Sequence, residues 1–323
     1  MTIQEIQSAT VNAEYERLLE EGLQSVEDAM LKVVNSDVTV LRDASRHILQ
    51  AGGKRVRPRL LLLAYLAAGG TDVEYASAPG AAVELMHTAS VVHDDINDHG
   101  VVRRGRASVN AKWGRTFALL TGDFLFTAVY ELMAPYGELN GDLAAAATAL
   151  VEGETLQAWT VKNNEFTREN YTRIIALKTA ALFRAGGVMG AKLAGANEET
   201  TDALANYAYN VGLAFQIIDD ILDIVGDEEK LGKTAGIDLE QGRGFAAVGG
   251  KTNGNGATTS DDGGEDVMES VKRKLMSGNR LQEAREQAEG LIHMAIALLD
   301  VLPNTYAKEQ LVDLANQVIN RDH

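Results

Sequence analysis

Two aspartate clusters with the same spacing are the residues of this sequence best suited to chemistry. They are Asp94-Asp95-Ile96-Asn97-Asp98 and, 125 residues further on, Asp219-Asp220-Ile221-Leu222-Asp223. Residues four apart share one face of a helix, so we expect each cluster to form a wall of carboxylate oxygens. Carboxylates crowded in this way raise one another's pKa unless a cation lies among them. Mg²⁺ prefers such oxygen ligands and completes its shell with water and substrate phosphates, so two facing walls would hold a diphosphate between metal ions.

The sequence before each cluster indicates that the clusters are not ordinary solvated helix faces. Residues 85–93 precede the first cluster and residues 211–218 precede the second, and both stretches are largely apolar. Carboxylates at the end of a buried apolar helix need a partner, because burying an unpaired charge costs much free energy.

Basic side chains that could bind phosphate occur near both clusters. A glycine-rich turn at 52–58 places Lys54, Arg55 and Arg57 at the start of a predicted helix, where the helix amino terminus also favours anions. Further candidates lie along the chain: His87, two helical turns before Asp94, then Arg103, Arg104, Lys178, Thr179 and Lys233.

The elements that would position these residues are helices. The chain has only four prolines, and its long runs rich in Ala, Leu and Glu favour helix almost throughout. We therefore predict an all-α bundle with no strands. The predicted helices cover residues 11–35, 38–51, 57–68, 72–98, 115–134, 138–161, 167–187, 200–225, 265–301 and 305–321.

Composition excludes several classes of function. The 323 residues include no cysteine, which rules out disulfides and thiolate metal sites. The formal net charge of −16 disfavours nucleic-acid binding, which needs a basic surface. The first residues show no signal peptide, and no apolar run reaches the roughly 18 residues of a membrane span. We expect a cytoplasmic enzyme without an integral membrane segment.

One segment differs from the rest in composition. Residues 249–264 are rich in Gly, Asn, Thr and Ser, which is typical of a flexible surface loop. Two interpretations stay open, a lid near the site and a passive insertion. The stretch Gly249-Gly250-Lys251-Thr252 lacks the first spaced glycine of a phosphate-binding loop and follows no strand, so we do not expect a nucleotide site there.

In order and spacing, these motifs resemble those of the trans-isoprenyl diphosphate synthase (polyprenyl synthetase) family. The resemblance covers nearly the whole chain, residues 1–323, as a single domain. It implies a bundle of long helices around a central cavity. The motifs that carry it lie at residues 52–58, 84–98, 103–105, 178–179, 215–223 and 232–233.

The resemblance also implies roles for individual residues. Lys54, Arg57, His87 and Arg104 correspond to an isopentenyl diphosphate site. Three Mg²⁺ ions would join an allylic diphosphate to the two clusters through Asp94, Asp98 and Asp219, while Asp95, Asp220 and Asp223 hold bound water or neighbouring cations. The allylic diphosphate site corresponds to Arg103, Lys178, Thr179, Gln216, Lys233 and Arg243.

The implied reaction is a head-to-tail condensation by a homodimeric enzyme. The allylic carbon–oxygen bond ionises to a carbocation, the double bond of isopentenyl diphosphate attacks it, and a proton is lost. In the family, residues one turn before the first cluster limit product length, and here they are the small Ala89 and Ser90. We therefore predict geranylgeranyl or longer polyprenyl diphosphate as the product.

Three other functions are weighed against this one. A class I terpene cyclase shares the fold and the metal-bound diphosphate, but it needs no second diphosphate site such as Lys54, Arg57 and His87 would form. A non-catalytic subunit of a prenyl synthase would tend to lose aspartates, and both clusters are complete. A calcium-binding module would need alternating oxygen ligands in a loop, which neither cluster has.

Overall fold

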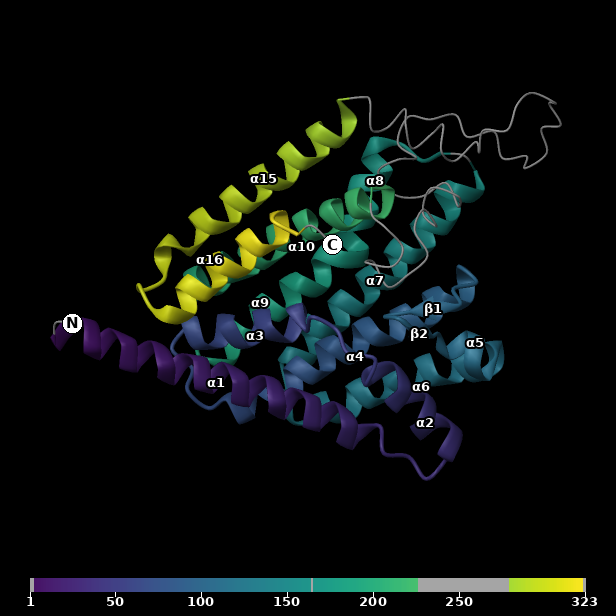
Figure 1. The fold of residues 1–323 in the computed structure, drawn as a ribbon, viewed down its shortest axis with the longest axis horizontal. Coiled ribbons are helices and arrows are strands. Elements are labelled where there is room, and N and C mark those ends of the chain that lie inside the picture. Colours follow the sequence, from purple (N-terminus) through teal and green to yellow (C-terminus); the bar gives the residue numbers. More distant parts are fainter. Residues whose placement is uncertain (1–2, 164, 226–278, 322–323) are drawn as a thin grey trace.

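The computed structural model describes residues 3–163, 165–225 and 279–321, which form an all-helical bundle apart from one short hairpin (Figure 1). The predicted fold class is thus confirmed. Lys233, Arg243, the loop at 249–264 and the start of the predicted helix at 265 lie outside the described residues.

The α-helices of the described part are α1 (Ile3–Val33), α2 (Thr39–Leu49), α3 (Val56–Ala67), α4 (Val73–Asn97), α5 (Val109–Trp113), α6 (Arg115–Met133), α7 (Leu139–Lys162), α8 (Arg168–Ile175), α9 (Ala181–Leu193), α10 (Glu198–Val225), α15 (Arg280–Leu298) and α16 (Tyr306–Ile319).

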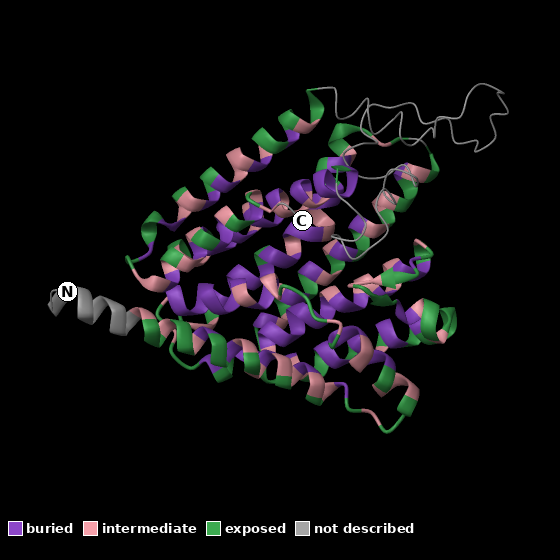
Figure 2. Cartoon of the chain, viewed as in Figure 1, coloured by how far each residue is buried: buried purple, intermediate pink, exposed green. Residues whose placement is uncertain are grey.

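The core lies around α3, α4, α9 and α10, which are buried over most of their length (Figure 2). Helices α1 and α15 pack on the outside of this group and keep exposed outer faces. Glycines on α9 allow its backbone to approach both neighbours. A Cβ atom at Gly190 would lie 2.5 Å from the Leu61 carbonyl oxygen of α3, and one at Gly187 would lie 2.5 Å from the Leu204 carbonyl oxygen of α10.

The segment after α4 differs from the prediction of a chain without strands. Two-residue strands β1 (Val102–Arg103) and β2 (Arg106–Ala107) pair antiparallel there. Arg104 and Gly105 connect them with φ values of 51° and 71°. Two successive residues with positive φ are typical of the tight turns that close hairpins. An Arg-Gly pair is not among the strongest sequence signals for such a turn, which is why the hairpin was not predicted.

The predicted helix at 167–187 proves longer and irregular. It runs from Arg168 to Leu193, and a π-helical turn, η2 (Ala176–Ala180), separates α8 from α9. Short 3-10 turns, η1 (Ala134–Tyr136) and η3 (Leu299–Val301), follow α6 and α15. π-helical turns are frequent at functional sites, and this one contains Lys178 and Thr179.

Two helical stretches of the described residues are long and apolar enough to cross a membrane, by length and composition only, although the sequence has no uninterrupted apolar run of that length. They are Arg115–Tyr136 and Arg168–Leu193. The second is mostly buried inside the bundle, as a core helix of a folded domain would be. The first is less buried and exposes Phe117, Leu119, Leu120 and Tyr130.

Candidate active site

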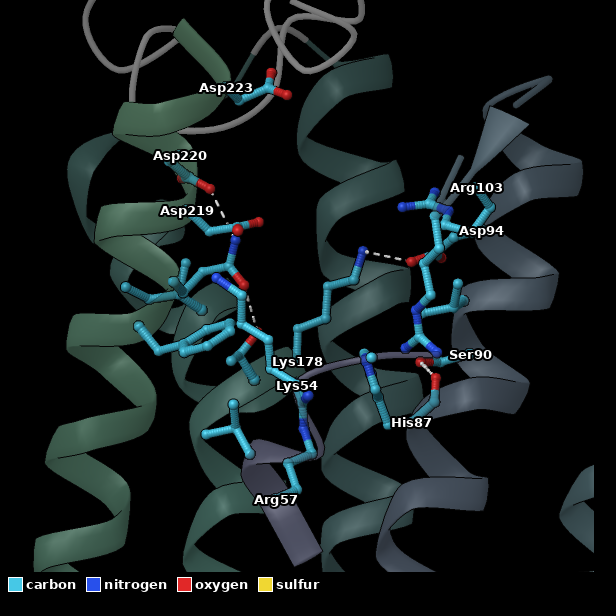
Figure 3. A pocket seen from close by; sticks show the side chains of 18 of the residues that line it. Lys54, Arg57, His87, Ser90, Asp94, Arg103, Lys178, Asp219, Asp220 and Asp223 are labelled. Carbon is cyan, nitrogen blue, oxygen red and sulfur yellow. Dashed lines mark hydrogen bonds and ion pairs between the residues drawn. The ribbon is translucent and has the colours of Figure 1, made fainter. Parts of the chain in front are cut away.

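The two aspartate clusters lie on opposite sides of one pocket of about 700 Å³ (Figure 3). Asp94 and Asp98 stand at the carboxyl end of α4, and Asp219, Asp220 and Asp223 stand near the carboxyl end of α10. The helices α4 and α10 are far apart in sequence, and packing through the core brings their ends to the same cavity. The predicted arrangement of two facing carboxylate walls is present.

Asp95 does not belong to the wall, although the sequence placed three carboxylates of the first cluster on one face. Its side chain is 1% exposed and does not line the pocket. Its Oδ1 atom accepts hydrogen bonds from Arg103 Nη2 at 2.6 Å and Nε at 3.0 Å. The reason is helical geometry, because neighbouring residues point about 100° apart around the axis. Asp95 therefore orients Arg103 at the pocket's edge.

The oxygens of the pocket fit a hard divalent cation, but only as part of a larger ligand set. Among the described residues, no group of three or more His, Asp or Glu side chains lies close enough to hold a metal ion alone. Mg²⁺ commonly keeps water and substrate phosphate oxygens as ligands, so a pair of separated carboxylate walls suits it.

The glycine-rich turn at 52–58 supplies fewer phosphate-binding cations than its sequence suggests. Arg55 adopts a left-handed conformation with φ of 46°, and its guanidinium forms ion pairs with Glu27 of α1 and Glu84 of α4. It also donates a hydrogen bond to the Leu49 carbonyl oxygen. Arg55 thus fastens the turn to three helices. It lines the pocket together with Lys54 and Arg57, but its guanidinium is already paired with carboxylates of the protein.

Four of the predicted phosphate-binding residues come together beside this turn. Lys54, Arg57, His87 and Arg104 all line the pocket, and Arg104 donates a hydrogen bond to the Gly52 carbonyl oxygen. Burial lowers the pKa of Arg57 to about 10, and its guanidinium lies 4.8 Å from the Phe183 ring centroid. Burial, and then the charges of Arg57 and Arg104, hold the pKa of His87 well below 6.5. Both effects favour the neutral form of the His87 imidazole.

A second group of polar side chains lies between the two walls. Lys178 projects from the π-helical turn, and its Nζ atom lies 3.6 Å from Asp94 Oδ2 (Figure 3). Thr179 Oγ1 donates a hydrogen bond to Gln216 Oε1 at 2.7 Å, and Gln216 Nε2 donates one to Asp220 Oδ1 at 2.8 Å. These bonds connect the π-helical turn to the second aspartate cluster.

Comparison with known proteins assigns the chain to a family. Residues 38–248 match the family model described as polyprenyl synthetase. The chain is 35% identical to the octaprenyl diphosphate synthase of Escherichia coli, over 94% of this chain and 97% of that protein. It belongs to the polyprenyl synthetase family. This polyprenyl synthetase is therefore a prenyltransferase, an enzyme that extends prenyl chains.

Other relatives agree with this assignment. The chain is 36% identical to component 2 of the heptaprenyl diphosphate synthase of Geobacillus stearothermophilus, over 94% of this chain and 97% of that protein. A crystal structure of a polyprenyl synthase from Caulobacter crescentus, complexed with calcium and isoprenyl diphosphate, superposes with a TM-score of 0.86. Its sequence is 31% identical, and the match covers 97% of this chain and 98% of that one.

The two residues expected to limit product length in this polyprenyl synthetase lie in different surroundings. Ser90 lines the pocket one turn before Asp94, whereas Ala89 is fully buried and does not line it. The pocket face of α4 carries His87, Ser90, Val91 and Asp94, and Ala89 points away from that face toward the core. Of the two residues, Ser90 alone borders this pocket, and the limit on product length stays a prediction.

Sequence reasoning missed two further polar residues beside Lys178. Its Nζ atom lies 2.8 Å from Glu154 Oε1 and donates a hydrogen bond to Gln157 Oε1 at 3.3 Å, and both partners belong to α7. Burial, and then the charge of Asp94, raise the pKa of Glu154 to about 7. The available signal was their spacing of three residues, which places both on one face of the helix.

Proposed function

We propose that this protein condenses isopentenyl diphosphate with an allylic diphosphate, head to tail and with Mg²⁺, to give geranylgeranyl or a longer polyprenyl diphosphate plus diphosphate. The observation that carries the proposal is the division of the pocket. Its facing walls, Asp94 with Asp98 and Asp219 with Asp223, suit one metal-bound diphosphate. The separate cations Lys54, Arg57 and Arg104 suit a second one.

In this proposal, each group of side chains has a part in the reaction. Three Mg²⁺ ions, held chiefly by Asp94, Asp98 and Asp219, would neutralise charge on the departing allylic diphosphate. Lys178 and Arg103 stabilise the same negative charge, while Thr179 and Gln216 fix the position of the leaving group. Lys233 and Arg243, which lie outside the described residues, are proposed for the same diphosphate.

The bonds exchanged in the reaction require no protein nucleophile. The allylic carbon–oxygen bond breaks, and the electron pair leaves with the diphosphate. The double bond of isopentenyl diphosphate then forms the new carbon–carbon bond, and a proton passes from the resulting cation to the released diphosphate. Lys54, Arg57, His87 and Arg104 hold isopentenyl diphosphate in place, which lowers the entropic cost of bringing the two carbons together.

The small side chain of Ser90 supports a product longer than farnesyl diphosphate. It leaves space on the pocket wall one turn before Asp94, where a bulky residue would obstruct a growing chain. Two of the relatives are named octaprenyl and heptaprenyl diphosphate synthases, which also favours a long product.

A homodimer in the cytoplasm is the assembly and location that we propose. Helix α6 exposes Phe117, Leu120 and Tyr130, and large exposed apolar groups on one helix are typical of a subunit interface. The substitution Leu120→Arg should then give a monomer in light scattering after size exclusion. The matched change Met294→Arg on exposed α15 should leave the assembly unchanged.

The test of function is incubation with isopentenyl diphosphate, Mg²⁺ and each of three primers, namely dimethylallyl, geranyl and farnesyl diphosphate, followed by chromatography. We expect elongated diphosphates with the wild type and a large loss with Asp94→Ala or Asp219→Ala. Release of a hydrocarbon without use of isopentenyl diphosphate would favour the terpene cyclase instead. Activity that requires a second protein would favour the subunit of a prenyl synthase.

A further inference from the structure

Arg321 brings an additional cation into the pocket from a part of the chain that no motif covers. It follows α16 and lines the pocket together with Lys54, Arg57 and Asp219. Its guanidinium carbon lies 4.4 Å from the centroid of the Phe215 ring on α10. The guanidinium carbon of Arg57 lies 5.9 Å from the same centroid. One aromatic ring thus serves two arginines, in the type of cation–π contact that holds a guanidinium in position.

These positive groups repel one another. Burial lowers the pKa of Arg321, and the nearby carboxylate of Asp219 opposes that shift. The charge of Arg321 in turn contributes to the lowered pKa of Lys54 and of Arg57, after burial in each case. Positive side chains that lie close together despite burial and mutual repulsion are typical of sites that bind a multiply charged anion.

Buried donors in the same group have no acceptor within the described part of the chain. Nη1 of Arg321 and Nε of Arg57 are both buried, and neither has a hydrogen-bond partner there. A buried donor without an acceptor is rare in folded proteins, and an anionic ligand is one way to satisfy it. Both donors belong to arginines that line one pocket and share the Phe215 ring.

We propose that Arg321 binds the diphosphate of isopentenyl diphosphate, together with Lys54 and Arg57. This inference rests on the proposed function and adds a residue to it. The pairing with Arg57 favours this diphosphate over the allylic one, whose proposed ligands Lys178 and Arg103 lie near the first aspartate cluster. The alternative is a structural role, in which Arg321 only fastens α16 to α10 through Phe215 and Asp219.

Steady-state kinetics of Arg321→Ala and Arg321→Lys would separate these roles. Loss of a charged hydrogen bond to substrate should raise KM for isopentenyl diphosphate by about tenfold or more in Arg321→Ala, with a small change in KM for the allylic substrate. Arg321→Lys should recover part of the loss because it keeps the charge. The control Arg17→Ala removes an exposed arginine of α1 outside the pocket and should change neither constant.

A binding measurement tests the site independently of catalysis. Titration calorimetry with inorganic diphosphate, in metal-free buffer, should show weaker binding to Arg321→Ala than to the wild type or Arg17→Ala. Equal affinities, an unchanged KM for isopentenyl diphosphate, or an equal rise in both KM values would overturn the assignment. If the wild type elongates no primer, the proposed function fails, while the calorimetry still decides whether Arg321 binds diphosphate.

Discussion

The ammonium group of Lys178 lies 2.8 Å from Glu154 Oε1 and 3.6 Å from Asp94 Oδ2, so one cation contacts two carboxylates on different helices. Lys178 is thereby held between α7 and α4. This relationship connects the first aspartate cluster to a helix that carries none of the motifs recognised in the sequence. Burial, and then the charge of Asp94, raise the pKa of Glu154, and Lys178 opposes that shift.

Glu154→Gln should stabilise the metal-free protein at high pH but not at low pH. The folded-state pKa of Glu154, about 7, exceeds its ordinary value of 4.5, so the folded protein binds this proton more tightly than the unfolded chain. Ionisation above pH 7 therefore costs stability, and the cost disappears as the pH falls from 7 to 4.5. The measurement is thermal unfolding with chelator at about pH 8 and about pH 5. Exposed Glu152, on the same helix, is the control, and an equal shift at both pH values would contradict the prediction.

Arg55→Met should destabilise the fold, and adding Glu84→Gln should recover part of the loss. Arg55 Nη1 donates to Glu84 Oε1 at 3.0 Å, and the Glu84 side chain is only 3% exposed. Removing the arginine leaves a buried carboxylate unpaired, which costs about 3 kcal/mol or more. The neutral amide of Glu84→Gln removes that charge. In denaturant unfolding, the double variant should therefore lose less unfolding free energy than the sum of the losses in the two single variants. Purely additive losses would indicate that Arg55 acts through other contacts.

Gly153→Ala should disturb the π-helical turn and weaken allylic substrate binding. A Cβ at Gly153 would lie 2.9 Å from the Lys178 backbone nitrogen and 3.0 Å from Leu177 Cβ, so the turn must move. We expect a loss of about 1–3 kcal/mol in unfolding free energy, together with a raised KM for the allylic diphosphate. Gly141→Ala is the matched control on α7, because its Cβ would meet nothing within 4 Å. It should be neutral, or stabilising by up to about 1 kcal/mol. Similar behaviour of the two variants would argue against the tight contact at Gly153.

Ser90→Phe should shorten the product, whereas Ala89→Phe should mainly reduce stability. Ser90 faces the pocket, so a phenyl ring there occupies space that a growing chain would use. Ala89 is fully buried, and overpacking a core position typically costs about 1–3 kcal/mol. Product chromatography and thermal unfolding of both variants check the prediction. A product of unchanged length from Ser90→Phe would rule out this residue as a limit on chain length.

Much of the helical fold could be predicted from the sequence because its signals are local. Scarce prolines and helix-favouring composition predicted the bundle, and most helix boundaries differ from the prediction by a few residues at most. The hairpin at 102–107 and the π-helical turn at 176–180 were missed. Both depend on backbone conformations that composition specifies only weakly, and in the π-helical turn on the close approach of Gly153.

The sequence by itself determined the chemistry of this protein: two carboxylate clusters at helical spacing, a glycine-rich basic turn, and a helical scaffold to carry them. These features depend on residue type and short-range spacing, which a linear chain displays directly. Only the tertiary structure decided which of these side chains face the pocket. It turned Asp95 toward Arg103, bound Arg55 to Glu27 and Glu84, and brought Glu154 and Arg321 beside the motif residues. The physical reason is that burial and ion pairing depend on which helices pack together, and these partners are distant in sequence.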